Sequence, residues 1–144
     1  MRRKQFIVFS IALVLLVVDR WLKSLAVSGV TSQLWFGQFI LFRNYGIIFS
    51  WPLPNIVAIV LMFVALAVVG WLLVQSRRRS DIPKIFATSL MVVGAISNIY
   101  DRLAFGYIID WAYLGRWWPV FNIADVCITV GLVLYLTSHR KVLS

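Results

Sequence analysis

The second half of the chain contains polar residues whose types and spacing suit acid–base chemistry. Residues 94–131 hold three aspartates and two asparagines, namely Asp101, Asp110, Asp125, Asn98 and Asn122. All five lie at or just inside the ends of apolar segments that are long enough to enter a bilayer. An ionisable side chain at membrane depth costs at least ~2.5 kcal/mol, and such residues usually mark a functional site. The aspartates are therefore the first candidates for catalysis.

Two carboxylates that lie close together in a partly dry site cannot both ionise easily, so they share a proton. An aspartic protease uses this state, because the ionised carboxylate accepts a proton from the attacking water while the protonated one donates to the peptide carbonyl. Asn98 and Asp101 repeat the N-x-x-D spacing of Asn122 and Asp125, which places amide and carboxylate on one helix face. On spacing alone, Asp101 would be the partner of Asp125, and Asp110 would be a loop carboxylate.

A purely structural interpretation of the polar residues stays open. Asn98, Asn122 and Arg102 could serve only to join membrane helices through hydrogen bonds, although the residues used in this way are usually neutral, which fits the aspartates less well. Cys127 lies two residues after Asp125, and hence on another helix face, with no histidine on the same side to activate it. We expect Cys127 to pack in the core.

The composition indicates what kind of protein positions these residues. The chain is 62% hydrophobic over 144 residues, with a mean hydropathy of +0.91, which predicts one integral membrane domain covering residues 1–144. The formal charge of +9 comes from basic residues beside apolar runs, which suggests topology signals and no nucleic-acid partner. One cysteine and one histidine exclude an intramolecular disulfide and a His/Cys zinc site, and we expect no metal or cofactor.

Four apolar segments predict an all-α membrane protein with four transmembrane helices, at about residues 5–27, 56–74, 83–100 and 122–137. The first could instead be a cleavable signal peptide. Against cleavage, Asp19, Arg20 and Lys23 stand where such a signal has neutral residues, so we expect a retained helix. Asp19 and Lys23 are four residues apart and should form an ion pair on one face.

The segment between the first two helices has a different pattern. Residues 34–36 and 39–42 are rich in aromatic and β-branched residues, which predicts short strands, and residues 43–46 favour a turn. Trp35, Tyr45 and Trp51 suit the membrane surface. Nine of the fourteen basic residues lie at the N-terminus, in residues 75–84 and in the C-terminal tail. Because cytoplasmic loops carry such an excess, we expect both termini in the cytoplasm and the small β-rich region on the extracytoplasmic side.

Five motifs, in order along nearly the whole chain, resemble those of the signal peptidase II family, the bacterial lipoprotein signal peptidases. They are Asp19-Arg-Trp-Leu-Lys23, Asn44-Tyr-Gly46-Ile-Ile-Phe49, Gly94-Ala-Ile-Ser-Asn98-Ile-Tyr-Asp101-Arg102, Gly106-Tyr-Ile-Ile-Asp110 and Phe121-Asn122-Ile-Ala124-Asp125. Any one of these motifs alone would be a weak signal. All five together are highly specific.

The resemblance implies an aspartic endopeptidase of the cytoplasmic (inner) membrane, with its active site on the extracytoplasmic side. Its substrate would be a prolipoprotein that carries diacylglycerol on its cysteine and is cut just before that cysteine; we expect membrane lipids around a monomeric enzyme. The catalytic pair would be Asp110 and Asp125, with Asp101 in a supporting network beside Arg102. The remaining supporting and substrate-positioning residues would be Asp19, Lys23, Asn44, Gly46, Asn98, Asn122 and Ala124.

The chain departs from the family pattern at several positions. Ser97 and Val93 replace usual glycines, and Tyr45, Ile47 and Ile48 stand where smaller residues are common. Bulk near the site would narrow the pocket. Two other functions stay open: a small four-helix proton-coupled transporter, in which intramembrane carboxylates bind protons, and a catalytically inactive relative that binds lipoproteins.

Overall fold

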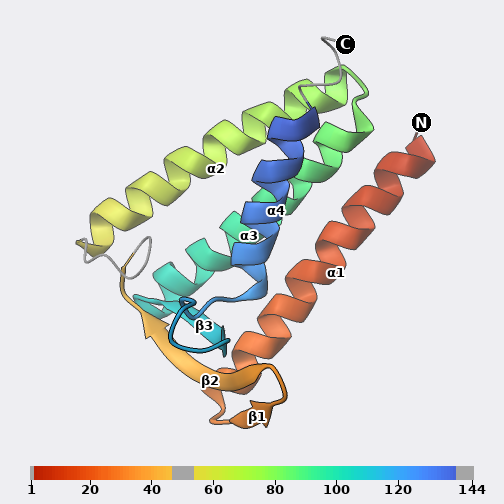
Figure 1. The fold of residues 1–144 in the computed structure, drawn as a ribbon. Helices are drawn as coiled ribbons and strands as arrows, with labels where there is room; N and C mark the ends of the chain where they lie inside the picture. The colour runs from red at the N-terminus through yellow and green to blue at the C-terminus, as the bar shows by residue number, and fades with distance from the viewer. Residues whose placement is uncertain (1, 47–53, 139–144) are drawn as a thin grey trace.

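The computed structural model describes residues 2–46 and 54–138 and contains four helices and three strands in that part of the chain (Figure 1). The helices are α1 (Arg2–Val27), α2 (Asn55–Arg78), α3 (Ile82–Phe105) and α4 (Ile123–Ser138), and the strands are β1 (Ser32–Leu34), β2 (Gly37–Asn44) and β3 (Ile108–Tyr113). Helices α1, α2 and α3 are long and apolar enough to cross a membrane. Helix α4 is apolar but has only 16 residues, so it is a shorter companion to these three candidate spans. The four predicted helices are confirmed.

Helix α3 is the centre of the bundle and packs against α1, α2 and α4. Its first turn is capped by the Asp81 carboxylate, which accepts a hydrogen bond from the Lys84 backbone nitrogen, and it ends at Gly106 in the left-handed region, with φ of 79°. Most of α2 is exposed on all sides, as expected for a helix that lies in lipid. Helix α3 therefore provides the frame on which the site is built.

Small residues bring α3 and α4 close together. A Cβ atom on Gly94 would lie 2.4 Å from the Ala124 carbonyl oxygen, and one on Gly131 would lie 2.6 Å from the Ala87 carbonyl oxygen. Such contacts let helix backbones approach closely inside a membrane. The first turn of α4 is consequently pressed against the part of α3 that follows Gly94.

The strands form one antiparallel sheet in the order β1-β2-β3. The prediction of strands between the first two helices is confirmed for β1 and β2, but the third strand comes from the connection between α3 and α4. The prediction of a loop around Asp110 was wrong, because Asp110 lies within β3 and pairs with Phe42 of β2. Local sequence did not reveal β3, since its backbone is satisfied by a strand more than sixty residues earlier.

The predicted turn at residues 43–46 was also wrong in part. Arg43 and Asn44 continue β2 and pair with Ile109 and Ile108 of β3, so their backbones follow the ladder. The turn chemistry begins one residue later, where the Asn44 side-chain oxygen accepts a hydrogen bond from the Gly46 nitrogen at 3.0 Å. The predicted strand at residues 34–36 is shifted, because β1 ends at Leu34 and exposed Trp35 lies in the turn before β2.

The sheet and the start of α4 lie at one end of the helices, while the start of α1 and the α2–α3 connection lie at the other (Figure 1). Arg77 and Arg78 occupy the last turn of α2, at the end remote from the sheet. Several residues with predicted roles fall outside the described residues: Ile47, Ile48, Phe49, Trp51, Pro52, His139, Arg140 and Lys141.

Candidate active site

The N-x-x-D motif at the start of α4 forms a reciprocal cap. The Asp125 backbone nitrogen donates to the Asn122 side-chain oxygen at 2.8 Å, and the Asn122 backbone nitrogen donates to Asp125 Oδ2 at 3.2 Å. This is a capping-box arrangement, which fixes the first turn of a helix. It holds the Asp125 carboxylate at a helix N-terminus, where the helix dipole favours a negative charge.

Asn122 also reaches the second carboxylate. Its side-chain nitrogen donates to Asp110 Oδ1 at 2.6 Å, and the side-chain nitrogen of Asn44 donates to Asp110 Oδ2 at 2.9 Å. Burial, and then the nearby Asp125 charge, raise the pKa of Asp110 to about 7. Asp110 is fully buried, whereas Asp125 is partly exposed. Asn122 therefore bonds both carboxyl groups, one of which holds a proton near neutral pH.

The amide of Asn98, on α3, completes the set around Asp125. Its nitrogen donates to Asp125 Oδ1 at 2.8 Å, while its oxygen accepts from Lys23 Nζ at 2.9 Å and from Asn122 at 3.3 Å. Because an ammonium group can only donate, Lys23 fixes which end of the Asn98 amide faces Asp125. The hydrogen bond between Asn122 and Asn98 thus joins α4 to α3, as the structural interpretation of these asparagines predicts.

Lys23 belongs to a buried ionic cluster that also contains Asp19, Arg20 and Asp101. The predicted Asp19–Lys23 ion pair is confirmed at 3.1 Å, and Lys23 lies 2.7 Å from Asp101. Arg20 is a second cation on Asp101, at 2.5 Å. Among the described residues, Asp101 contacts these two cations and one backbone nitrogen, and it does not line the cleft beside Asp125.

Both acids of this cluster also hold the backbone beside the candidate pair. Asp101 accepts a hydrogen bond from the nitrogen of Ile109, the residue before Asp110, at 3.2 Å. Asp19 accepts one from the nitrogen of Ala124, the residue before Asp125, at 3.0 Å. The cluster thereby ties α1 and α3 to the two main-chain segments that present the carboxylates.

Arg20 and Ser97 were not among the predicted site residues, although Arg20 belongs to this cluster and Ser97 hydrogen-bonds to it. Ser97 donates to Asp19 Oδ2 at 2.5 Å and accepts from Arg20 at 3.2 Å and from Lys23 at 3.3 Å. The available signals were the adjacency of Arg20 to Asp19 and of Ser97 to Asn98. The expected crowding of the pocket by Ser97 is not seen, because its side chain is buried in the cluster.

Arg102 has a different partner from the one expected. Its guanidinium donates to the backbone oxygens of Tyr45 and Gly46, at 2.9 and 2.5 Å. It lies in the last turn of α3, and its long side chain extends toward the chain that follows β2, so its support of Asp101 in one network stays a prediction. Arg102 therefore anchors the segment that follows Asn44.

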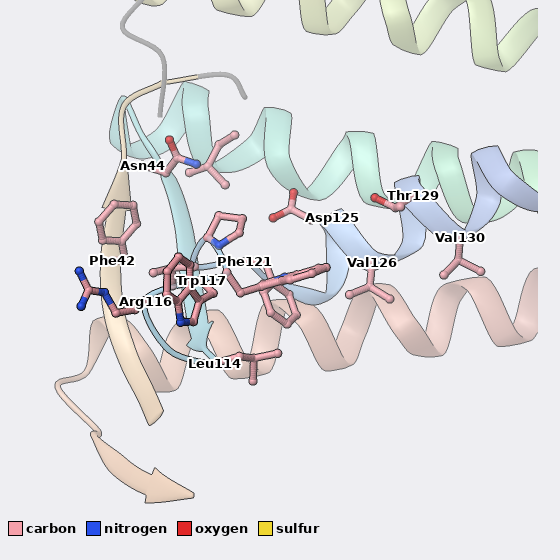
Figure 2. Close-up of a pocket in the computed structure, with 14 residues that line it drawn as sticks. Phe42, Asn44, Leu114, Arg116, Trp117, Phe121, Asp125, Val126, Thr129 and Val130 are labelled. Carbon is pink, nitrogen blue, oxygen red and sulfur yellow. The ribbon is translucent and has the colours of Figure 1, made fainter. Parts of the chain in front are cut away.

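A cleft of about 890 Å³ opens beside Asp125 (Figure 2). One wall is the apolar face of α4, with Val126, Thr129 and Val130, and another includes Phe42 and Asn44 of β2. The loop between β3 and α4 closes one side with aromatic residues. Asn44 lines the cleft and donates to Asp110, so it stands at the boundary between the cleft and the buried carboxyl.

Comparison with known proteins agrees with this arrangement. The family described as signal peptidase (SPase) II matches residues 11–140. The chain belongs to the signal peptidase II family. This membership confirms the resemblance inferred from the five motifs, and with it the predicted activity of an aspartic-type lipoprotein signal peptidase.

Individual relatives of the signal peptidase II family match along most of their length. A lipoprotein signal peptidase of Chlorobaculum parvum is 32% identical and aligns with 93% of this chain and 95% of its own. A lipoprotein signal peptidase of Thermodesulfovibrio yellowstonii is 33% identical and aligns with 88% of this chain and 90% of its own. A solved bacterial membrane enzyme, determined by the in meso method at 2.3 Å resolution, superposes with a TM-score of 0.80 over 95% of this chain and 89% of its own. At 21% identity, that structure supports the fold alone.

Proposed function

We propose that Asp110 and Asp125 are the catalytic pair with which this family member cleaves diacylglyceryl-modified prolipoproteins on the N-terminal side of the lipidated cysteine. The observation that carries the proposal is Asn122, which hydrogen-bonds both carboxylates. One carboxylate opens on an apolar cleft and the other is buried behind Asn44. Asp101, the partner suggested by spacing, is instead bound to two cations.

The environments of the two carboxyl groups suggest their roles. Asp125 lines the cleft, where water can reach it, and accepts N–H groups from Asn98 and Asn122, so it is the carboxylate that takes a proton from the attacking water. Asp110, with its raised pKa, donates its proton to the peptide carbonyl oxygen as the new carbon–oxygen bond forms. When the carbon–nitrogen bond breaks, the proton held by Asp125 passes to the leaving amine, and one hydroxyl of the intermediate returns its proton to Asp110 as the carbonyl re-forms. Asn44 is the side chain that the substrate carbonyl displaces to reach Asp110.

The cleft also suits the two apolar parts of this substrate. The signal peptide and the acyl chains both lie in the bilayer, and the α4 wall presents Val126 and Val130 to the cleft. The site lies at the sheet end of the bundle, opposite the basic α2–α3 connection. By the positive-inside rule this connection is cytoplasmic, so the active site faces the extracytoplasmic surface.

Expression in bacteria depleted of their own enzyme tests the proposal. Wild type should convert the accumulated prolipoprotein to its mature form, whereas Asp110→Asn and Asp125→Asn should leave it uncut. Asp81→Asn is a matched control at the opposite end of α3, because asparagine also caps helices. An uncut precursor with folded wild type would indicate an inactive relative, and cleavage by either active-site variant would overturn the assigned pair.

A further inference from the structure

We propose that Arg116 selects prolipoproteins with an acidic residue shortly after the lipidated cysteine. This inference rests on the proposed function and concerns the part of the substrate that becomes the mature lipoprotein. Arg116 lies in the loop between β3 and α4, is exposed, and lines the cleft that contains Asp125.

The cleft has two chemically different ends. Figure 2 shows Val130 at one end and Arg116 beside β2 at the other, with Asp125 between them. Val130 belongs to the apolar helix α4, which enters the membrane, whereas Arg116 belongs to the loop at the sheet end. One end of the cleft therefore faces lipid and the other faces the aqueous side.

The substrate polypeptide can lie in this cleft in only one direction. The signal peptide and the diacylglyceryl group are both apolar and remain in the bilayer, so they occupy the α4 end. The mature polypeptide is the hydrophilic part of the substrate and must leave through the other end. The first residues after the cysteine consequently pass Arg116.

The aqueous end of the cleft carries a positive charge from Arg116. Arg116 and Asp125 are the two formally charged residues among the described residues that line the cleft, and Asp125 is at the centre. Arg116 packs its guanidinium 5.7 Å from the ring centroid of Trp117, its neighbour in the loop. An acidic substrate side chain would therefore meet a cation held beside an aromatic ring, whereas a lysine would be repelled.

The expected preference is modest because Arg116 is exposed to solvent. Exposed ion pairs of this kind change binding by about two- to five-fold and weaken as salt increases. The effect should appear in kcat/KM, since the contact is remote from the scissile bond and forms when the substrate binds.

The test uses purified full-length enzyme in a neutral detergent with three diacylglyceryl-modified prolipoproteins. These differ only in carrying Asp, Asn or Lys at the positions just after the cysteine. Wild type should cleave them in the order Asp, Asn, Lys, with the spread shrinking in high salt. Arg116→Gln should bring the ratio of the Asp rate to the Lys rate close to one, and Arg116→Glu should reverse the order. Arg43→Gln is the matched control, because exposed Arg43 on β2 stacks on Tyr107 and does not line the cleft.

The outcomes separate the inference from the proposed function. If wild-type enzyme cleaves all three substrates equally, or if Arg116→Gln keeps the preference, the inference fails while the proposed function stands. If Arg116→Gln is slower than wild type on all three substrates alike, and only when anionic lipid is present, Arg116 binds a lipid headgroup and the inference fails. If no substrate is cleaved, the proposed function itself is wrong.

Discussion

Asn122 is the residue on which both carboxylates depend. Its backbone and side-chain oxygen cap α4 and fix Asp125, while its side-chain nitrogen bonds Asp110. With all these groups engaged, the amide has one orientation, and the two acids receive different surroundings. One asparagine thereby joins a buried carboxyl, whose pKa is raised, to a second carboxyl that opens on the cleft.

The pH profile should report the proton on Asp110. Its pKa lies near 7, raised from 3.8, and only the protonated form can donate to the substrate carbonyl. We therefore expect kcat/KM to fall as the pH rises through about 7. The Asn44 hydrogen bond lowers this pKa, so Asn44→Ala should move the alkaline limb to higher pH. Gln33→Ala, an exposed change on β1, should leave the limb in place. An unchanged limb in Asn44→Ala would contradict the assigned proton donor.

At the scale of elements, a helix, a strand and a buried ionic cluster together form the site. Helix α4 supplies Asp125, β3 supplies Asp110, and the buried ionic cluster between α1 and α3 holds the backbone nitrogen before each of them. Removing one charge from such a cluster leaves an uncompensated charge in a dry environment, which is strongly destabilising. The cluster thus makes the bundle and the geometry of the pair interdependent.

Variants of Asn122 should separate helix capping from carboxylate bridging. Serine also caps helices, whereas alanine does not, and the difference is typically about 1 kcal/mol. Asn122→Ala should lower both the thermal stability in detergent and the activity. Asn122→Ser should keep most of the stability yet lose the bond to Asp110, which predicts a roughly ten-fold or greater loss of kcat. Near wild-type kcat in Asn122→Ser would show that the bridge is dispensable.

At the scale of the whole molecule, the helices set the depth and direction of the site. Helix α4 rises about 24 Å at 1.5 Å per residue, less than the ~30 Å of a hydrocarbon core. The sheet and the aromatic loop gather at the end where α4 begins, and the arginines at the end of α2 lie at the opposite one (Figure 1). An acid pair at the start of a short helix can meet both water and lipid.

Labelling with a membrane-impermeant maleimide should establish this orientation in intact cells. The single native cysteine, Cys127, is buried and should react slowly. A cysteine at Trp117, which is 92% exposed in the β3–α4 loop, should be labelled from outside. Arg79→Cys, in the α2–α3 connection, should react only after the cytoplasmic membrane is made permeable. The reverse pattern would place the active site in the cytoplasm.

The sequence alone determined the helices, the strand-forming segment after the first helix, the Asp19–Lys23 pair and the family, because each depends on local periodicity or on motifs of fixed spacing. The tertiary structure decided which groups meet. Only the sheet reveals β3, and only the packing of α1 on α3 directs Asp101 toward Arg20 and Lys23. Local spacing made Asp101 and Asp125 look equivalent. Contacts between residues far apart in the chain gave them different partners, because a buried carboxylate takes its state from its surroundings.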